Sequence, residues 1–164
     1  MQRFSCLKWS AVLAAAACVG GMMLATPAFA ARSTRISGVG FLDESDICDS
    51  ESVGADFALI MTGDLEGCLY VFVETAEYTP SGTYVETGRE LFVSADGSFE
   101  TAYRFEAKYE DPANLIGEIF GRCQHIIVAD SGTGVFEGVG GRIDFKDDIE
   151  AGDFPYRGSL QFAD

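Results

Sequence analysis

The chain has 164 residues, a formal net charge of −15 and an aromatic content of 12%. A surface this acidic repels nucleic acid and anionic lipid, so we expect neither as a partner. The length suits one domain that can bury a core without a metal ion or many disulfides.

The first 30 residues are predicted to be a Sec-type export signal. Arg3 and Lys8 give a positive start, an apolar stretch follows, and a small-x-small pattern predicts cleavage after Ala30. The apolar stretch is short and interrupted by glycine, which disfavours a membrane span. We therefore expect a secreted or periplasmic domain of residues 31–164. Loss of Arg3 and Lys8 changes its net charge from −15 to −17.

The predicted domain alternates between apolar and polar residues and shows little helical periodicity. Residues 98–109 are the clearest strand, with Phe99, Tyr103 and Phe105 on one face and charged residues on the other. The pattern predicts an all-β fold of about eight antiparallel strands, either an up-and-down barrel or a sandwich. The other strands are expected at 36–42, 55–62, 67–74, 83–94, 118–128, 134–146 and 154–162, with a loop or a single turn at 109–117.

Three cysteines remain after the signal: Cys48, Cys68 and Cys123. An odd number in an oxidising compartment predicts one disulfide and one free thiol. We favour Cys68–Cys123 because both residues lie in strand-like segments, whereas Cys48 lies in an acidic loop; pairings that include Cys48 remain open. These cysteines and His125 do not have the spacing of a common zinc site.

Two acidic segments, 43–51 and 144–153, are predicted to be loops. Neither has the carboxylate spacing of a common calcium loop. We interpret them as solvated loops that discourage edge-to-edge pairing of strands, and we predict no metal ion and no cofactor.

Four residues are candidate ligand-binding residues. His125, the only histidine, lies on the predicted interior face of its strand and could act in acid–base chemistry. Tyr84, Glu86 and Glu90 share one face of the strand 83–94. Because Val85, Leu91 and Val93 occupy the other face, we favour solvent exposure of both glutamates; an inward orientation would make them polar contacts for a ligand.

The segment 131–141, SGTGVFEGVGG, carries the most specific pattern in the chain. Gly132 and Gly134 are predicted to allow positive φ in a tight turn, and Phe136 is predicted to fill the core. Gly138 and Gly141 suit a bend, a bulge or a close backbone approach. A phosphate-binding loop is not expected, because no helix and no Lys-Ser/Thr pair follows.

This segment resembles the glycine-rich signature near the C-terminus of allene oxide cyclases, and the aromatic segment 154–162 is similar to their last strand. Dirigent proteins share a looser version. The chain most resembles exported bacterial proteins of the allene oxide cyclase barrel-like kind. The resemblance implies an eight-stranded antiparallel barrel that holds an apolar ligand.

The resemblance does not extend to catalysis. Allene oxide cyclases use a carboxylate from an early strand and an asparagine inside an apolar cavity. No residue here matches that carboxylate by motif, and the only asparagine, Asn114, lies in the predicted loop at 109–117. The favoured hypothesis is therefore a non-enzymatic barrel that binds a small apolar molecule or is filled by its own side chains. An isomerase or cyclase of the allene oxide cyclase type, or a dirigent-like protein, is the alternative.

Overall fold

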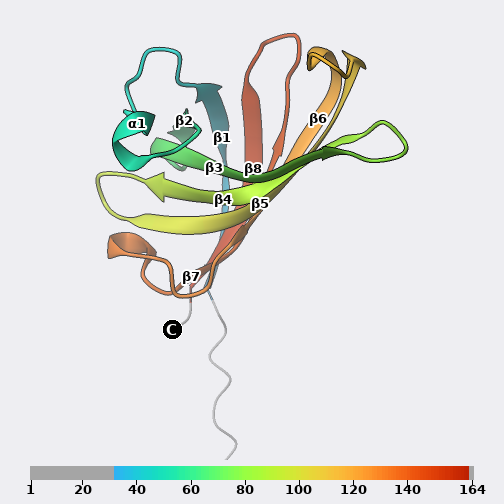
Figure 1. The fold of residues 1–164 in the computed structure, drawn as a ribbon. Helices are drawn as coiled ribbons and strands as arrows, with labels where there is room; N and C mark the ends of the chain where they lie inside the picture. Colours follow the sequence, from blue (N-terminus) through green and yellow to red (C-terminus); the bar gives the residue numbers. More distant parts are fainter. Residues whose placement is uncertain (1–31, 163–164) are drawn as a thin grey trace, which may run out of the picture.

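A computed structural model describes residues 32–162, which form a closed barrel of eight antiparallel strands (Figure 1). Each strand pairs with the next along the chain, and β1 closes the ring on β8. The all-β, up-and-down prediction is thereby confirmed; the predicted signal lies outside the described residues. No helix between residues 32 and 162 is long and apolar enough to cross a membrane. The strands are β1 (Arg32–Leu42), β2 (Phe57–Gly63), β3 (Gly67–Tyr78), β4 (Tyr84–Val93), β5 (Ser98–Asp111), β6 (Ile116–Ile127), β7 (Val139–Lys146) and β8 (Phe154–Phe162).

Several local elements differ from the sequence-based expectation. The loop expected at 109–117 is limited to 112–115, because β5 runs to Asp111 and β6 begins at Ile116. The strand expected at 134–146 begins only at Val139, because Gly134–Phe136 forms a 3-10 turn, η1. A single-turn helix, α1 (Ser50–Val53), lies in the first acidic segment. Its start is stabilised by the Asp49 side chain, which accepts a hydrogen bond from the backbone N–H of Ser52.

One end of the barrel is closed by an aromatic cluster of Phe92, Phe99 and Phe136. The ring centroids lie 5.0 to 5.8 Å apart, and Phe99 is completely buried. Phe136 reaches this cluster from η1, seen at the lower left of Figure 1. The prediction that Phe136 fills the core is confirmed.

The glycines of the 131–141 segment serve two different purposes. Gly134 has a φ of 60°, and a Cβ there would strike the carbonyl oxygen of Asp96. The expectation of positive φ at Gly132 is wrong: this residue is needed because a Cβ would strike the carbonyl oxygen of Phe136. Gly141, in β7, combines a φ of 120° with a close approach to the Ser159 carbonyl of β8. The segment therefore allows η1 to fold back against the barrel end.

The disulfide joins Cys48 to Cys68, so the expected Cys68–Cys123 pairing is wrong. Strand alternation places Cys123 on the inner face of β6 and Cys68 on the outer face of β3, on opposite sides of the barrel wall. Cys48 reaches Cys68 because the loop at 43–49 is folded over β2: Asp43 accepts hydrogen bonds from the backbone N–H groups of Ile47 and Cys48. These bonds, the one from Cys48 above all, also lower the pKa of Asp43. Such a disulfide is typical of an oxidising compartment.

Candidate functional site

A cavity of about 280 Å³ lies inside the barrel, on the side away from the aromatic cluster. It is open at one end and has largely apolar walls. Its volume is at the lower limit for a small-molecule site, roughly 300–1,000 Å³. The lining residues come from seven strands and one hairpin turn: Phe57, Leu59, Val71, Tyr84, Glu86, Glu90, Tyr103, Phe105, Tyr109, Leu115, Glu118, Cys123, His125, Phe145 and Phe154, with Asp147 from the loop after β7.

A buried polar cluster lies in the wall of the cavity. The Oε2 atom of Glu90 accepts a hydrogen bond from the Thr101 hydroxyl and lies 2.5 Å from Nδ1 of His125. All three residues are at most 3% exposed. Because a carboxylate oxygen can only accept hydrogen bonds, Nδ1 of His125 is the donor in the second contact. The other ring nitrogen, Nε2, is buried and has no hydrogen-bond partner among residues 32–162.

A second polar group is centred on Glu86, nearer the open end. Its two carboxylate oxygens accept hydrogen bonds from the hydroxyls of Tyr84, at 2.6 Å, and Tyr103, at 2.8 Å. Burial and these bonds to Glu86 raise the pKa of both tyrosines, so the phenols remain protonated donors. The glutamate is thus held by two aromatic rings that also form the wall.

The structure brings the four predicted ligand-binding residues together at one cavity: His125, Glu86, Glu90 and Tyr84 all line it. The favoured solvent exposure of both glutamates is wrong, since Glu90 is 2% exposed and Glu86 points inward beside it. Their role in binding remains a prediction. Thr101 and Tyr103 complete the two polar groups as hydrogen-bond donors to these acids. Alternation places Tyr103 on the uncharged face of its strand but predicts a hydrogen bond to these acids for neither residue.

A pair of carboxyl groups occupies the cavity mouth. Asp147 and Glu118 both approach the backbone at Gly121, where any side chain would collide with them. Burial, followed by interaction with the Glu118 carboxyl, raises the pKa of Asp147 to about 7. Burial and the same two acids raise the pKa of nearby Tyr109 to about 12. The expectation that the acids of segment 144–153 are solvated is therefore wrong for Asp147.

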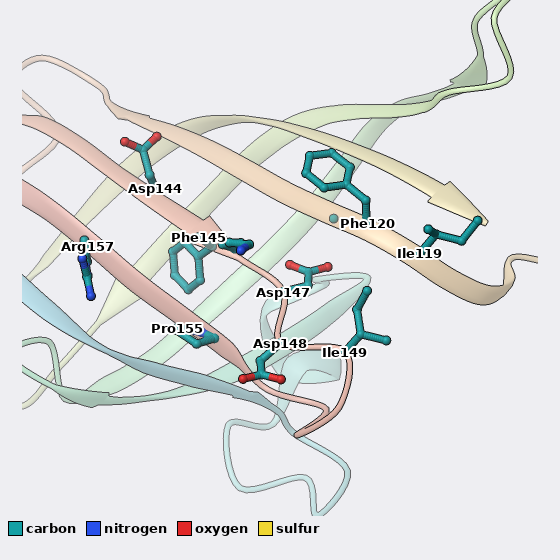
Figure 2. Close-up of a pocket in the computed structure, with 11 residues that line it drawn as sticks. Ile119, Phe120, Asp144, Phe145, Asp147, Asp148, Ile149, Pro155 and Arg157 are labelled. Atoms are coloured by element: carbon teal, nitrogen blue, oxygen red, sulfur yellow. The ribbon is translucent and has the colours of Figure 1, made fainter. Parts of the chain in front are cut away.

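An outer groove of about 780 Å³ adjoins the cavity mouth (Figure 2). Figure 2 shows Asp147 in the loop after β7, which also carries Ile149, beside β6, which carries Ile119 and Phe120. Asp147 and Phe145 line both the groove and the cavity. The protonation state of Asp147 therefore sets the charge at the boundary between them.

The raised pKa of Asp147 predicts a pH-dependent loss of stability. Between about pH 4 and pH 7 the Asp147 carboxyl holds more of its proton in the folded protein than in the unfolded chain, so its contribution to stability falls as the pH rises through this window. Asparagine at position 147 does not titrate. We therefore expect the free energy of unfolding of Asp147→Asn, relative to that of wild type, to rise by about 1–2 kcal/mol between pH 4 and pH 8. This value is smaller than the free energy that corresponds to the whole pKa shift, because the site is partly open to solvent.

Urea unfolding of both proteins across this pH range measures the difference. Asp148→Asn is the matched control, because Asp148 is exposed and lies next in the chain. Stability curves of Asp147→Asn and wild type that stay parallel from pH 4 to pH 8 would contradict the assignment.

The third cysteine does not contribute a reactive group to the site. Cys123 is free, and burial, followed by the charge of Glu90, raises its pKa. A thiol of this kind is a weak nucleophile. The chemistry available in the cavity is therefore that of hydrogen bonding, carboxylate charge and one imidazole.

The sequence matches no protein-family model, and neither a curated protein nor a solved structure is detectably similar to it. The cavity and its two polar groups are thus the features from which a function can be argued.

Proposed function

We propose that this chain is an exported β-barrel protein of the allene oxide cyclase barrel-like kind that binds a small, mainly apolar molecule inside the barrel. The observation that carries the proposal is the open cavity with aromatic walls and one buried nitrogen, Nε2 of His125, that has no partner among residues 32–162. A buried polar atom without a partner is costly in a folded protein, and a ligand hydrogen bond would remove that cost. The signal-like start of the sequence and the disulfide support export.

The hydrogen-bond pattern specifies what the ligand must offer to His125. With Nδ1–H donating to Glu90, a neutral imidazole has its lone pair on Nε2. The complementary ligand has an apolar body and at least one O–H or N–H donor. The small volume limits it to one or two rings or a short chain.

A small fluorescent phenol, 2-naphthol, tests this proposal by titration. We expect saturable one-to-one binding to wild type and loss of binding in Val71→Phe, which fills the cavity from the inner face of β3. Val128→Phe introduces the same change at a residue that is 38% exposed and should bind as wild type does. No saturable binding by wild type, or equal binding by Val71→Phe, would overturn the proposal.

A second candidate function, an isomerase or cyclase, is favoured by the pairing of Glu90 with His125. A carboxylate that holds one imidazole nitrogen as a donor leaves the other able to accept a proton from a bound substrate. The asparagine of the allene oxide cyclase mechanism has no counterpart in the cavity, since Asn114 lies in the β5–β6 turn and donates to Asp111. Incubation with an unstable fatty-acid epoxide tests this candidate: a product formed no faster and no more stereoselectively than without protein would exclude it.

A further inference from the structure

The cavity is unusually rich in negative charge and hydrogen-bond acceptors. Two of its acids lie in the wall, Glu86 and Glu90, and two at the mouth, Glu118 and Asp147. Of the described residues that line it, none is lysine or arginine, and His125 is the only one that can become positive. An anionic ligand such as a fatty acid would meet like charges in a poorly solvated space, which is strongly unfavourable.

The walls reinforce this preference for positive charge. Aromatic rings present a negative face, which attracts ammonium groups within about 6 Å of the ring centroid. Tyr84 packs edge-on against Phe105 and Tyr109, so rings around the Glu86 carboxylate lie at steep angles to one another. Seven rings contribute to the wall: Phe57, Tyr84, Tyr103, Phe105, Tyr109, Phe145 and Phe154.

Three hydroxyl groups in or beside the wall, those of Tyr84, Tyr103 and Thr101, add acceptors rather than donors. The protons of Tyr84 and Tyr103 are used by Glu86, and the proton of Thr101 is used by Glu90. What these groups leave for a ligand is lone pairs: on the phenolic oxygens of Tyr84 and Tyr103, on the Glu86 carboxylate and on Nε2 of His125. The His125 side chain is 4% exposed, and its Nε2 atom has no hydrogen-bond partner within the described chain.

We infer that the ligand is a small organic ammonium ion, an amine with an aromatic or aliphatic body. The ammonium group is neutralised by Glu86 and donates hydrogen bonds to acceptors of the wall, while the apolar body packs against the rings. The inference rests on the proposed function, because it requires that the cavity admits a small molecule. The overall negative charge of the protein favours approach of such a cation at low ionic strength.

Three probes of similar size but different charge test the inference: benzylammonium, benzyl alcohol and benzoate. At pH 8 Asp147 is mainly ionised, and the ring signals of His125, the only histidine, report binding inside the barrel by NMR. We expect benzylammonium to bind at least about 10-fold more tightly than benzyl alcohol, with no measurable binding of benzoate. Glu86→Gln should weaken benzylammonium by about 10-fold and leave benzyl alcohol within about 2-fold.

Glu100→Gln removes the same charge from the exposed face of β5 and is the matched control. Equal affinities for benzylammonium and benzyl alcohol would overturn the inference and leave the proposed function intact. Benzylammonium binding that weakens equally in both variants, or that leaves the His125 signals unshifted, would place the cation on the outer surface and also overturn it. If neither benzyl alcohol nor benzylammonium shifts the His125 signals, the inference fails, and the 2-naphthol titration decides whether the proposed function fails with it.

Discussion

Replacing Glu90 by leucine is expected to lower the free energy of unfolding by about 3–5 kcal/mol, because it leaves two buried donors without an acceptor. The Thr101 hydroxyl and Nδ1 of His125 both depend on Oε2 of Glu90, and neither side chain has access to bulk water. Leucine also removes the carboxylate that links β4 to Thr101 of β5 and to His125 of β6. Urea unfolding at pH 7, analysed for both midpoint and slope, measures the loss.

Two further variants separate hydrogen bonding from packing at this position. Glu90→Gln keeps one amide oxygen as an acceptor and should lose only about 1–2 kcal/mol. The double variant Glu90→Leu/His125→Leu removes the stranded imidazole, so it should be more stable than the sum of the single changes predicts, by about 1–3 kcal/mol. Strict additivity, or a loss below about 1 kcal/mol for Glu90→Leu, would contradict the interpretation of this cluster.

The Glu90 cluster also shows where sequence patterns succeed and where they fail. Alternation locates β4 and β5 within one or two residues, because a period of two is a direct consequence of strand geometry. It misassigns the faces of β4, since Val85, Leu91 and Val93 lie on the outer face and the acids on the inner one. A carboxylate inside the barrel is stable only when hydrogen-bond donors lie next to it. The pairing register of the neighbouring strands decides whether they do.

Register is the information that a single sequence does not display. Glu90 lies directly opposite Thr101 in the β4–β5 pairing, and Tyr103 lies opposite His125 in the β5–β6 pairing. These two pairings place the donors next to the acids. In the same way, the disulfide depends on which side of the wall each cysteine faces and on how a loop folds over it, neither of which follows from spacing along the chain.

The glycine-rich segment 131–141 was informative for another reason: part of its constraint, the positive φ of Gly134, is local, whereas the close approaches of Gly134 to Asp96 and of Gly141 to Ser159 are not. A φ near 60° at Gly134 and a large apolar residue two positions later favour a tight turn that returns a side chain to the barrel, although the start of β7 was predicted five residues too early. The sequence therefore predicts the core role of Phe136 correctly. The cavity at the opposite side is formed by many strands at once, and its existence could not be predicted from any one of them.

Truncation of Phe99 to alanine is expected to cost about 3–5 kcal/mol, a large part of the total stability of a domain this size. The ring is fully buried between Phe92 and Phe136, with centroids 5.0 and 5.1 Å away, and these neighbours are held by β4 and by η1. They cannot close the space without moving the backbone, so the loss includes a cavity as well as the transferred apolar area. The urea midpoint should fall with little change in slope, because the surface exposed on unfolding is nearly the same.

The matched control is Phe41→Ala, since Phe41 is 42% exposed near the end of β1 and should cost less than about 1 kcal/mol. The cluster of Phe92, Phe99 and Phe136 does not line the cavity, so Phe99→Ala should reduce stability but leave 2-naphthol affinity near the wild-type value at low temperature. A loss of stability without a loss of affinity is expected if one end of the barrel is closed and purely structural while the other is open to ligands. A loss of affinity that parallels the loss of stability would instead mean that the two ends are coupled and that the cavity depends on the aromatic cluster for its shape.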